Sequence, residues 1–375
     1  MGNTKWIWQQ KNYPNFTYNP DIITPLLEKI AQEQGYLIAF TSIMNEESLK
    51  QRQFETLTNE AINTSAIEGE MLNRESVKAS VRRKLGLETI KTYNKDESTD
   101  NLISILIDAN TNYDNDLTLD RLFGWHNAMF PKGYSGFTKI NVAKFRGEET
   151  MQVVSGSIGK EKVYYEAPPR EILDEEMKIY LEWFNTKESS LLKAAIAHLW
   201  FVVIHPFDDG NGRVTRAITD LVLSKIEKSK ISRLYSLSSA INSDRKGYYK
   251  ALEATTGYKA TQTPMDITLW CEWFLNTLYS SLIDTKNSLN YILEKTEFWD
   301  RHKESDLNAR QMKVINKILD MGKENFIGGL NKRKYQAIAK ATSTTASRDI
   351  KELIEKGCIK KIDGSVGRNT SYEIL

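Results

Sequence analysis

The chain has 375 residues, of which 40% are hydrophobic, and this length and composition predict two or three domains with buried cores. Its net charge of +2 excludes binding to polyanions through the chain as a whole. With only Cys271 and Cys358, it supports neither a disulfide framework nor a zinc cluster, so we expect a reducing compartment.

Targeting and membrane signals are missing from the sequence pattern. Residues 1–20 lack a basic start followed by an apolar core, so no secretory signal is predicted. The longest apolar run, Leu191 to Ile204, contains Lys193 and His198 and is too short to span a bilayer. We therefore expect a cytoplasmic protein without membrane contact.

The N-terminal region is predicted to be helical. Asp21 is placed to cap a helix whose apolar residues recur at helical spacing from Ile23 to Ile30. A second helix is predicted from about Glu46 into the stretch Thr64 to Gly69. By the residues alone this stretch is a helix boundary, because Ser65 and Glu68 have the spacing of a capping box and Gly69 suits a helix end.

The middle of the chain combines helices with one hairpin. Leu119 to Phe130 is predicted as a helix, with His126 interpreted as a structural histidine. Residues 151–156 and 162–165 are β-prone runs around a glycine-containing turn, which predicts a hairpin. The stretch from Leu191 to Phe201 is apolar almost all round and predicts a buried helix, with His198 as a core histidine.

The stretch Ile204 to Arg216, IHPFDDGNGRVTR, contains several groups suited to phosphate chemistry. His205 could accept a proton near neutral pH, and Asp209 is a hard oxygen ligand for Mg²⁺. The glycine-rich turn at 210–212 permits backbone N–H groups to surround an anion. A helix starting near Gly212 would add partial positive charge, with arginines at 213 and 216 on its surface.

Each of these features also has a structural explanation when it stands alone. Gly-Asn-Gly is an ordinary turn, and two arginines on a helix are usually solvated. A structural turn, however, does not require a histidine, an aspartate and paired arginines at these spacings. The combination therefore predicts a phosphoryl-chemistry site.

HPFDDGNGR followed by Arg216 resembles the signature of Fic-domain proteins, HPFx(D/E)GNGRxxR, with every specified position present. The resemblance implies a mainly α fold: a helical Fic core with a β-hairpin flap, an N-terminal helical domain and a C-terminal winged helix. We place these domains at residues 106–300, 1–105 and 301–375. The implied activity is transfer of AMP from ATP to a hydroxyl group of a protein.

The resemblance assigns a role to each position of the motif. It implies that His205 is the general base and that Asp209 binds Mg²⁺. Around the phosphates it places the backbone of Gly210, Asn211 and Gly212, and at the β and γ end Arg213 and Arg216. The same chemistry needs a deprotonated hydroxyl, a metal across the phosphates and cations on the departing pyrophosphate.

Thr64-Ser65-Ala66-Ile67-Glu68-Gly69 resembles the inhibitory motif of the same family, (S/T)xxxE(G/N). The resemblance implies that Glu68 pairs with Arg216 and prevents the γ-phosphate of ATP from docking productively. Because this motif precedes the core in the same chain, the inhibition would be intramolecular, as in the second of the three classes of the family.

Two further positions are assigned to the nucleotide site by resemblance. The hairpin at 151–165 resembles the Fic flap, which aligns a target polypeptide by strand addition, and Ser155 stands where the family has a second Val. Tyr248 and Tyr249, in RKGYYKALEATT, have two interpretations. Both are core aromatics, or the second lies near the adenine or ribose.

The composition changes at Asp306, and residues 307–375 contain fourteen Lys or Arg against seven Asp or Glu. Helices are predicted at 311–319, 334–340 and 344–356, with strands at 358–362 and 371–375. This pattern fits a winged helix, which would read DNA through Ser343, Thr344, Thr345, Ser347 and Arg348. The alternative is a module that contacts proteins or stabilises the chain and binds no DNA.

Other activities remain open on the same scaffold. They include transfer of UMP, phosphocholine or phosphate, and removal of AMP with Glu68 positioning water. A different class is a DNA-binding regulator whose Fic core senses nucleotide. The sequence does not identify the target protein. A homodimer is expected by resemblance, and self-modification is a separate hypothesis.

Overall fold

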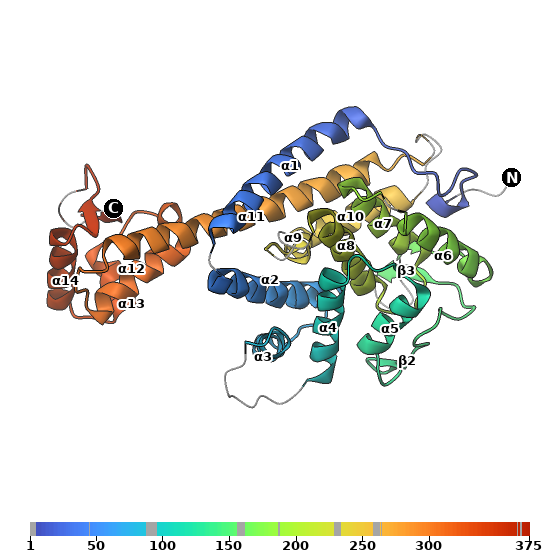
Figure 1. The fold of residues 1–375 in the computed structure, drawn as a ribbon, viewed down its shortest axis with the longest axis horizontal. Helices are drawn as coiled ribbons and strands as arrows, with labels where there is room; N and C mark the ends of the chain where they lie inside the picture. Colours follow the sequence, from blue (N-terminus) through green and yellow to red (C-terminus); the bar gives the residue numbers. More distant parts are fainter. Residues whose placement is uncertain are drawn as a thin grey trace. The chain divides into compact units, whose positions relative to one another are not determined.

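The computed structural model describes residues 5–44, 46–87, 96–155, 162–186, 188–228, 234–257, 263, 265–365, 367 and 370–375. These residues are mainly α-helical, as predicted, and their short strands form antiparallel two-stranded pairs (Figure 1). The chain divides into two compact units, Met1–Ile283 and Asp284–Leu375. This division falls within helix α11 (Thr268–Arg301). The separation of residues 1–105 from the Fic core stays a prediction.

The first unit begins with a short 3-10 helix, η1 (Ile7–Gln9), and the long helix α1 (Pro20–Ile43). The N-cap of α1 was predicted at Asp21, but it lies two residues earlier, at Asn19. Asn19 has the extended backbone of a cap, and its side chain accepts the Asp21 N–H at 3.0 Å. Pro20 occupies the first helical position, where its fixed φ suits a helix and its missing N–H is not needed.

Three helices, α2 (Glu46–Ile67), α3 (Arg74–Lys84) and α4 (Glu97–Thr111), share one apolar core. The core residues of each helix recur at helical spacing, so each helix buries one face. The core consists of Phe54, Ala61, Val77, Val81, Leu102, Ile103 and Leu106. This packing places the C-terminal end of α2 at a defined position. Gly69 follows that end with φ of +86°, a conformation that favours glycine.

The rest of the first unit carries the motif from His205 to Arg216. Its elements in chain order are α5 (Leu119–Met129), β1 (Tyr134–Ser135), β2 (Thr138–Lys139), β3 (Gln152–Ser155), β4 (Lys162–Glu166), α6 (Arg170–Phe184), α7 (Leu191–Ile204), α8 (Asn211–Glu227), α9 (Leu237–Ser243) and α10 (Arg245–Thr256). The predicted hairpin is confirmed, since β3 pairs antiparallel with β4, with an irregularity between Val153 and Val154. Helix α7 packs along α8 and is buried over most of its surface, as its apolar sequence predicts.

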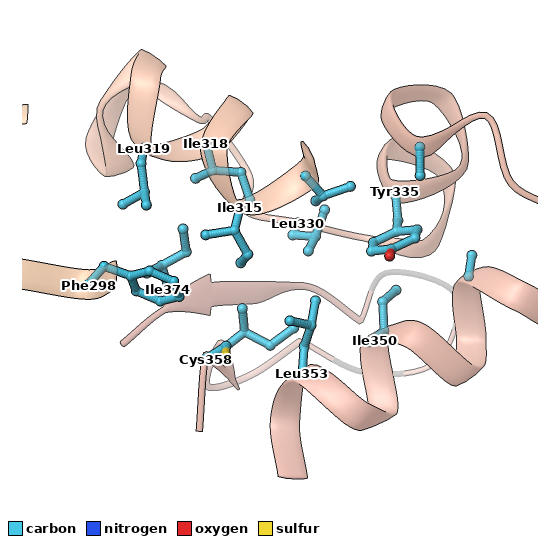
Figure 2. Close-up of a cluster of buried hydrophobic side chains, with 14 residues drawn as sticks. Phe298, Ile315, Ile318, Leu319, Leu330, Tyr335, Ile350, Leu353, Cys358 and Ile374 are labelled. Atoms are coloured by element: carbon cyan, nitrogen blue, oxygen red, sulfur yellow. The ribbon is translucent and has the colours of Figure 1, made fainter. Parts of the chain in front are cut away.

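The second unit contains the end of α11, then α12 (Ala309–Met321), η2 (Lys323–Asn325), α13 (Lys332–Ala339), α14 (Ser343–Glu355), β5 (Ile359–Lys361) and β6 (Tyr372–Ile374). Figure 2 shows its core, in which side chains from the helices converge on the strand that carries Ile374. Strand β6 pairs with β5 and also exchanges two backbone hydrogen bonds with Leu330. The helices and strands lie where the sequence predicts them; the winged-helix assignment itself stays a prediction.

Candidate functional site

His205 lies immediately after the last residue of α7. Its backbone is left-handed, with φ of +50°, and its N–H still bonds the Phe201 carbonyl at 3.0 Å. Nδ1 of the ring lies 3.3 Å from the Val202 carbonyl, which can only accept, so Nδ1 carries the proton. Nε2 then has a free lone pair. Burial lowers the pKa of His205 to about 4, so the ring is neutral at physiological pH.

Arg146 holds the loop that carries His205. It is 2% exposed and donates through Nε to the His205 carbonyl at 2.8 Å, and a second guanidinium nitrogen donates to the Pro168 carbonyl. Its backbone N–H bonds the Pro206 carbonyl at 2.9 Å. Sequence reasoning missed this residue, because one arginine in a loop shows no spacing that distinguishes it.

The hairpin that resembles the Fic flap contacts the last turn of α7. Tyr165, on β4, is buried and donates its hydroxyl to the Val203 carbonyl at 2.7 Å, two residues before His205. Ser155 ends β3, but its side chain lies outside the described part of the chain. Its assignment to the nucleotide site therefore stays a prediction.

Asp209 is partly exposed and held in one orientation. Ser135, on β1, donates its hydroxyl to one carboxylate oxygen, and the Gly210 N–H donates to the other. Its carbonyl accepts from Nε2 of buried His126 at 3.0 Å, and Nδ1 of that histidine accepts the Ala143 N–H at 3.3 Å. His126 is therefore a supporting residue, and burial lowers its pKa.

The residues around Asp209 fit Mg²⁺ held by one carboxylate. Among the described residues, no group of three or more His, Cys, Asp or Glu side chains is arranged to hold a metal ion. Mg²⁺ usually takes one or two protein carboxylates and completes its octahedron with water and substrate phosphates. The neighbouring Asp208 has a structural role, because it accepts the Asn141 N–H at 2.7 Å.

The turn at 210–212 forms the N-terminus of α8. Gly210 has φ of +82°, and a Cβ there would lie 2.8 Å from the Phe130 ring. Asn211 is 3% exposed, and its side chain accepts the Phe207 N–H at 2.9 Å and donates to the Phe207 carbonyl at 2.7 Å. The Asn211 side chain therefore shapes the loop, and the first-turn N–H groups of α8 remain as the anion donors.

Arg216 is 1% exposed and contacts the C-terminal end of α2. Its Nε donates to Thr64 Oγ1 at 2.6 Å, and Nη2 donates to the Thr64 carbonyl at 2.8 Å. Nη2 also lies 2.8 Å from Glu68 Oε1, so the ion pair expected by resemblance is present. Burial opposes the charge of this guanidinium, but the Glu68 carboxylate raises the pKa of Arg216 above its usual value.

Arg213 lies one turn earlier on α8 and has its own acidic partner. Its Nη1 lies 2.8 Å from Glu70 Oε2, and its guanidinium stacks over the Phe130 ring at 5.1 Å. Glu70 was missed by sequence reasoning, although it directly follows the predicted inhibitory motif. Both arginines that the resemblance assigns to phosphates are thus paired with carboxylates from one turn.

The two tyrosines of α10 differ in their surroundings. Tyr248 is buried, and its hydroxyl lies 3.0 Å from Nε2 of His198. His198 also contacts Thr219 Oγ1 at 2.9 Å and is fully buried, so its prediction as a core histidine is confirmed. Tyr249 is 41% exposed and donates to the Ile67 carbonyl at 3.1 Å, at the end of α2. A contact with adenine or ribose stays a prediction.

Helix α14 of the second unit has a polar exposed face. Ser343, Thr344, Ser347 and Arg348 are exposed, and Thr345 is half-buried. Arg348 lies near the carboxylates of Asp349 and Glu352, at 3.9 and 3.8 Å. DNA binding by this face stays a prediction.

The architecture and the site together define a helical protein in which a glycine-rich helix N-terminus follows a neutral histidine. Residues 116–223 match the Fic/DOC family, and residues 6–87 match a domain of unknown function, DUF4172. The chain therefore contains a Fic/DOC-type domain at residues 116–223.

Curated relatives of the chain are protein adenylyltransferases. The Fic adenylyltransferase of Nematostella vectensis is 22% identical over 208 residues, which are 53% of this chain and 44% of that protein. The Fic adenylyltransferase of Drosophila virilis is 31% identical over 123 residues, 30% of this chain and 24% of that protein. The matches span less than half the length of these relatives.

Two solved structures share the fold. A Fic family protein from Desulfovibrio desulfuricans superposes with a TM-score of 0.55 at 18% identity, covering 96% of this chain and 98% of that one. Fic-1 from C. elegans superposes with a TM-score of 0.50 at 18% identity, covering 72% of this chain and 73% of that one. In the part of the chain that the structure describes, no helix is long and apolar enough to cross a membrane.

Proposed function

We propose that this chain is a protein adenylyltransferase that transfers AMP from ATP to a hydroxyl side chain of a target protein, and that Glu68 restrains it. The observation that carries the proposal is the position of His205. Its unprotonated Nε2 belongs to the same loop as the N-terminus of α8, which presents Arg213 and Arg216. A base, an anion-binding helix end and two cations are the groups that this reaction needs.

In the proposed reaction, His205 Nε2 takes the proton of the target hydroxyl as its oxygen attacks the α-phosphorus of ATP. The bond from the α-phosphorus to the bridging oxygen breaks, and pyrophosphate leaves with the electron pair. The first-turn N–H groups of α8 and the two arginines stabilise the charge on the departing pyrophosphate. Mg²⁺ bound at Asp209 would neutralise phosphate charge during this step.

The proposed restraint acts on Arg216. In this structure its Nη2 is paired with the partly exposed Glu68 at 2.8 Å, and leaving the buried guanidinium without a replacement anion is costly. A γ-phosphate that takes this arginine must displace Glu68. Thr64 fixes the guanidinium from the same helix end, so the arginine stays in place for either anion.

The test compares the labelling of protein by ATP labelled at the α-phosphate or at the γ-phosphate, using the wild type, Glu68→Gly and Glu68→Gln with Mg²⁺. Substrates are the chain itself and an extract of the source cells. We expect α-label on protein, at least tenfold more with either Glu68 variant than with the wild type, and a mass increase of one AMP. The Gln variant separates loss of charge from the added backbone freedom of glycine.

The matched control is Glu75→Gln, which removes an exposed carboxylate that pairs with Lys78 on α3 and should leave labelling unchanged. Label from the γ-phosphate alone would show phosphate transfer and overturn the proposal. The absence of α-label with both Glu68 variants and both substrates would also contradict it. UTP and CTP, tested in parallel, decide which nucleotide is transferred.

A further inference from the structure

A short acidic turn faces the two site arginines. We call Glu68, Gly69 and Glu70 the acidic turn. Glu68 pairs with Arg216 and Glu70 with Arg213, each at 2.8 Å. The arginines are three residues apart on α8 and therefore neighbours on one helix face, and the two carboxylates lie on either side of one glycine.

The backbone of the acidic turn is held in place. The Glu68 and Glu70 N–H groups both bond the Ser65 carbonyl at 3.0 Å, and the Gly69 N–H bonds the Ala66 carbonyl at 3.0 Å. Tyr249 adds a hydrogen bond to the Ile67 carbonyl at 3.1 Å. The fold therefore presents the two carboxylates together from one anchored turn.

The acidic turn also lies against the start of α8, where an anion is favoured. A Cβ built on Gly212 would be 2.1 Å from Glu68 Oε1, so the Glu68 carboxylate touches the backbone of the first helical turn. The N-terminus of a helix stabilises negative charge through its free N–H groups and its dipole. Carboxylates here occupy the place of a bound anion.

Neither arginine has all its donors satisfied by the protein. Nη1 of Arg216 and Nε of Arg213 are buried without a hydrogen-bond partner among the described residues. A carboxylate supplies two acceptor oxygens, whereas a phosphate supplies three and reaches more of the donors of each guanidinium. The two ion pairs of the acidic turn thus leave guanidinium donors unused, and a phosphate could bind these donors.

We propose that Glu70 is a second internal ligand of the site, and that the acidic turn occupies Arg213 and Arg216 together as two neighbouring phosphate groups of a nucleoside triphosphate would. This inference rests on the proposed function for the identity of the ligand. Release of Glu68 alone then leaves Arg213 paired, and full access requires both carboxylates to leave. The Glu70 side chain is 45% exposed, so its effect is smaller than that of Glu68.

The test measures equilibrium binding of ATP and of inorganic tripolyphosphate, a probe without base or ribose, to the wild type, Glu68→Gln, Glu70→Gln and the double variant. We expect Glu70→Gln to tighten binding about two- to fivefold, and the double variant to bind more tightly than Glu68→Gln. Glu75→Gln is the charge control and should leave the affinity unchanged.

An Arg213→Ala background completes a double-mutant cycle. There, Glu70→Gln should have no effect, because its partner is gone. An equal gain in that background would show a general charge effect and overturn the inference, as would unchanged affinity with Glu70→Gln in both the wild type and Glu68→Gln. These binding results are separate from transfer: AMP labelling without any effect of Glu70 leaves the proposed function standing, and a Glu70 effect without labelling leaves this inference standing.

Discussion

Two buried polar clusters, one in each unit, show how a site differs from a structural network. In the second unit, the fully buried Asp349 accepts from Arg310 Nε at 2.9 Å and from the Tyr335 hydroxyl at 3.0 Å. In the first unit, the nearly fully buried Arg216 keeps one nitrogen that has no hydrogen-bond partner in the part of the chain that the structure describes.

The difference lies in what completes each cluster. Asp349 has its partners within one folded unit, so the network stabilises the fold and requires no ligand. Arg216 is held in part by Thr64 and in part by the Glu68 carboxylate, which we propose that an external anion replaces. Buried donors that the fold leaves unsatisfied are expensive, and they persist where a ligand supplies the missing acceptor.

The largest effect on activity should come from His205, the proposed base of the first-unit site. His205→Ala removes the proposed base, and we expect at least a hundredfold loss of AMP transfer in the Glu68→Gly background. Because burial lowers the pKa of His205 to about 4, kcat/KM should decline only as pH falls toward that value, where the ring becomes protonated. Initial rates from pH 4 to 8 measure this.

The control for His205→Ala is the thermal unfolding midpoint and ATP affinity of the variant, which should match the background protein. Transfer that persists within a few fold of the background would show that another group accepts the proton.

The next largest effect should be a loss of stability when the hydrogen-bond network around Asp349 in the second unit is broken. Asp349→Ala leaves Arg310 and Tyr335 without their buried acceptor, so we expect a loss of about 3 kcal/mol in the free energy of unfolding of this unit. Urea denaturation followed by tryptophan fluorescence measures it, with Trp299 as a reporter in the same unit. Glu355→Ala, an exposed position on the same helix, should cost under about 0.5 kcal/mol. Equal losses in the two variants would contradict a structural role for this network.

The smallest effect on stability should come from Glu227, a buried carboxyl group in the first unit. Glu227 accepts through one oxygen from Gln34 at 2.6 Å and from Tyr235 at 2.9 Å. Its other oxygen has no hydrogen-bond partner among the residues that the structure describes, and burial raises the pKa of Glu227 to about 7. The folded state keeps this proton up to about pH 7, whereas the unfolded chain releases it near 4.5. Stability is therefore lost as pH rises through this window.

Glu227→Gln keeps the shape of the side chain and cannot ionise. The free energy of unfolding of this variant, minus that of the wild type, should therefore be larger at pH 8 than at pH 5, by on the order of 1 kcal/mol. Denaturation of both proteins at the two pH values gives this difference, and other titrating groups cancel in it. The same difference at both pH values would show that Glu227 does not titrate in this range.

Local sequence patterns predicted a large part of this molecule. The apolar spacing of α7, the β-prone runs of β3 and β4, and the elements of the second unit all depend on residues near each other in the chain. The motif from His205 to Arg216 is also local, so its loop and helix start were predictable. The Glu68 pairing came from a second local motif and a resemblance, and the distance to Arg216 agrees with it.

The sequence by itself therefore determined the helices, the hairpin and the identity of the groups in the motif, because those follow from short-range spacing. Only the tertiary structure decided which distant groups support them. Arg146 reaches the His205 carbonyl across 59 residues, Ser135 reaches Asp209 across 74, and Glu70 pairs with Arg213 across 143. Such contacts have no periodic signature, because tertiary packing brings together segments that are far apart in the chain, and many loops and turns carry these residue types.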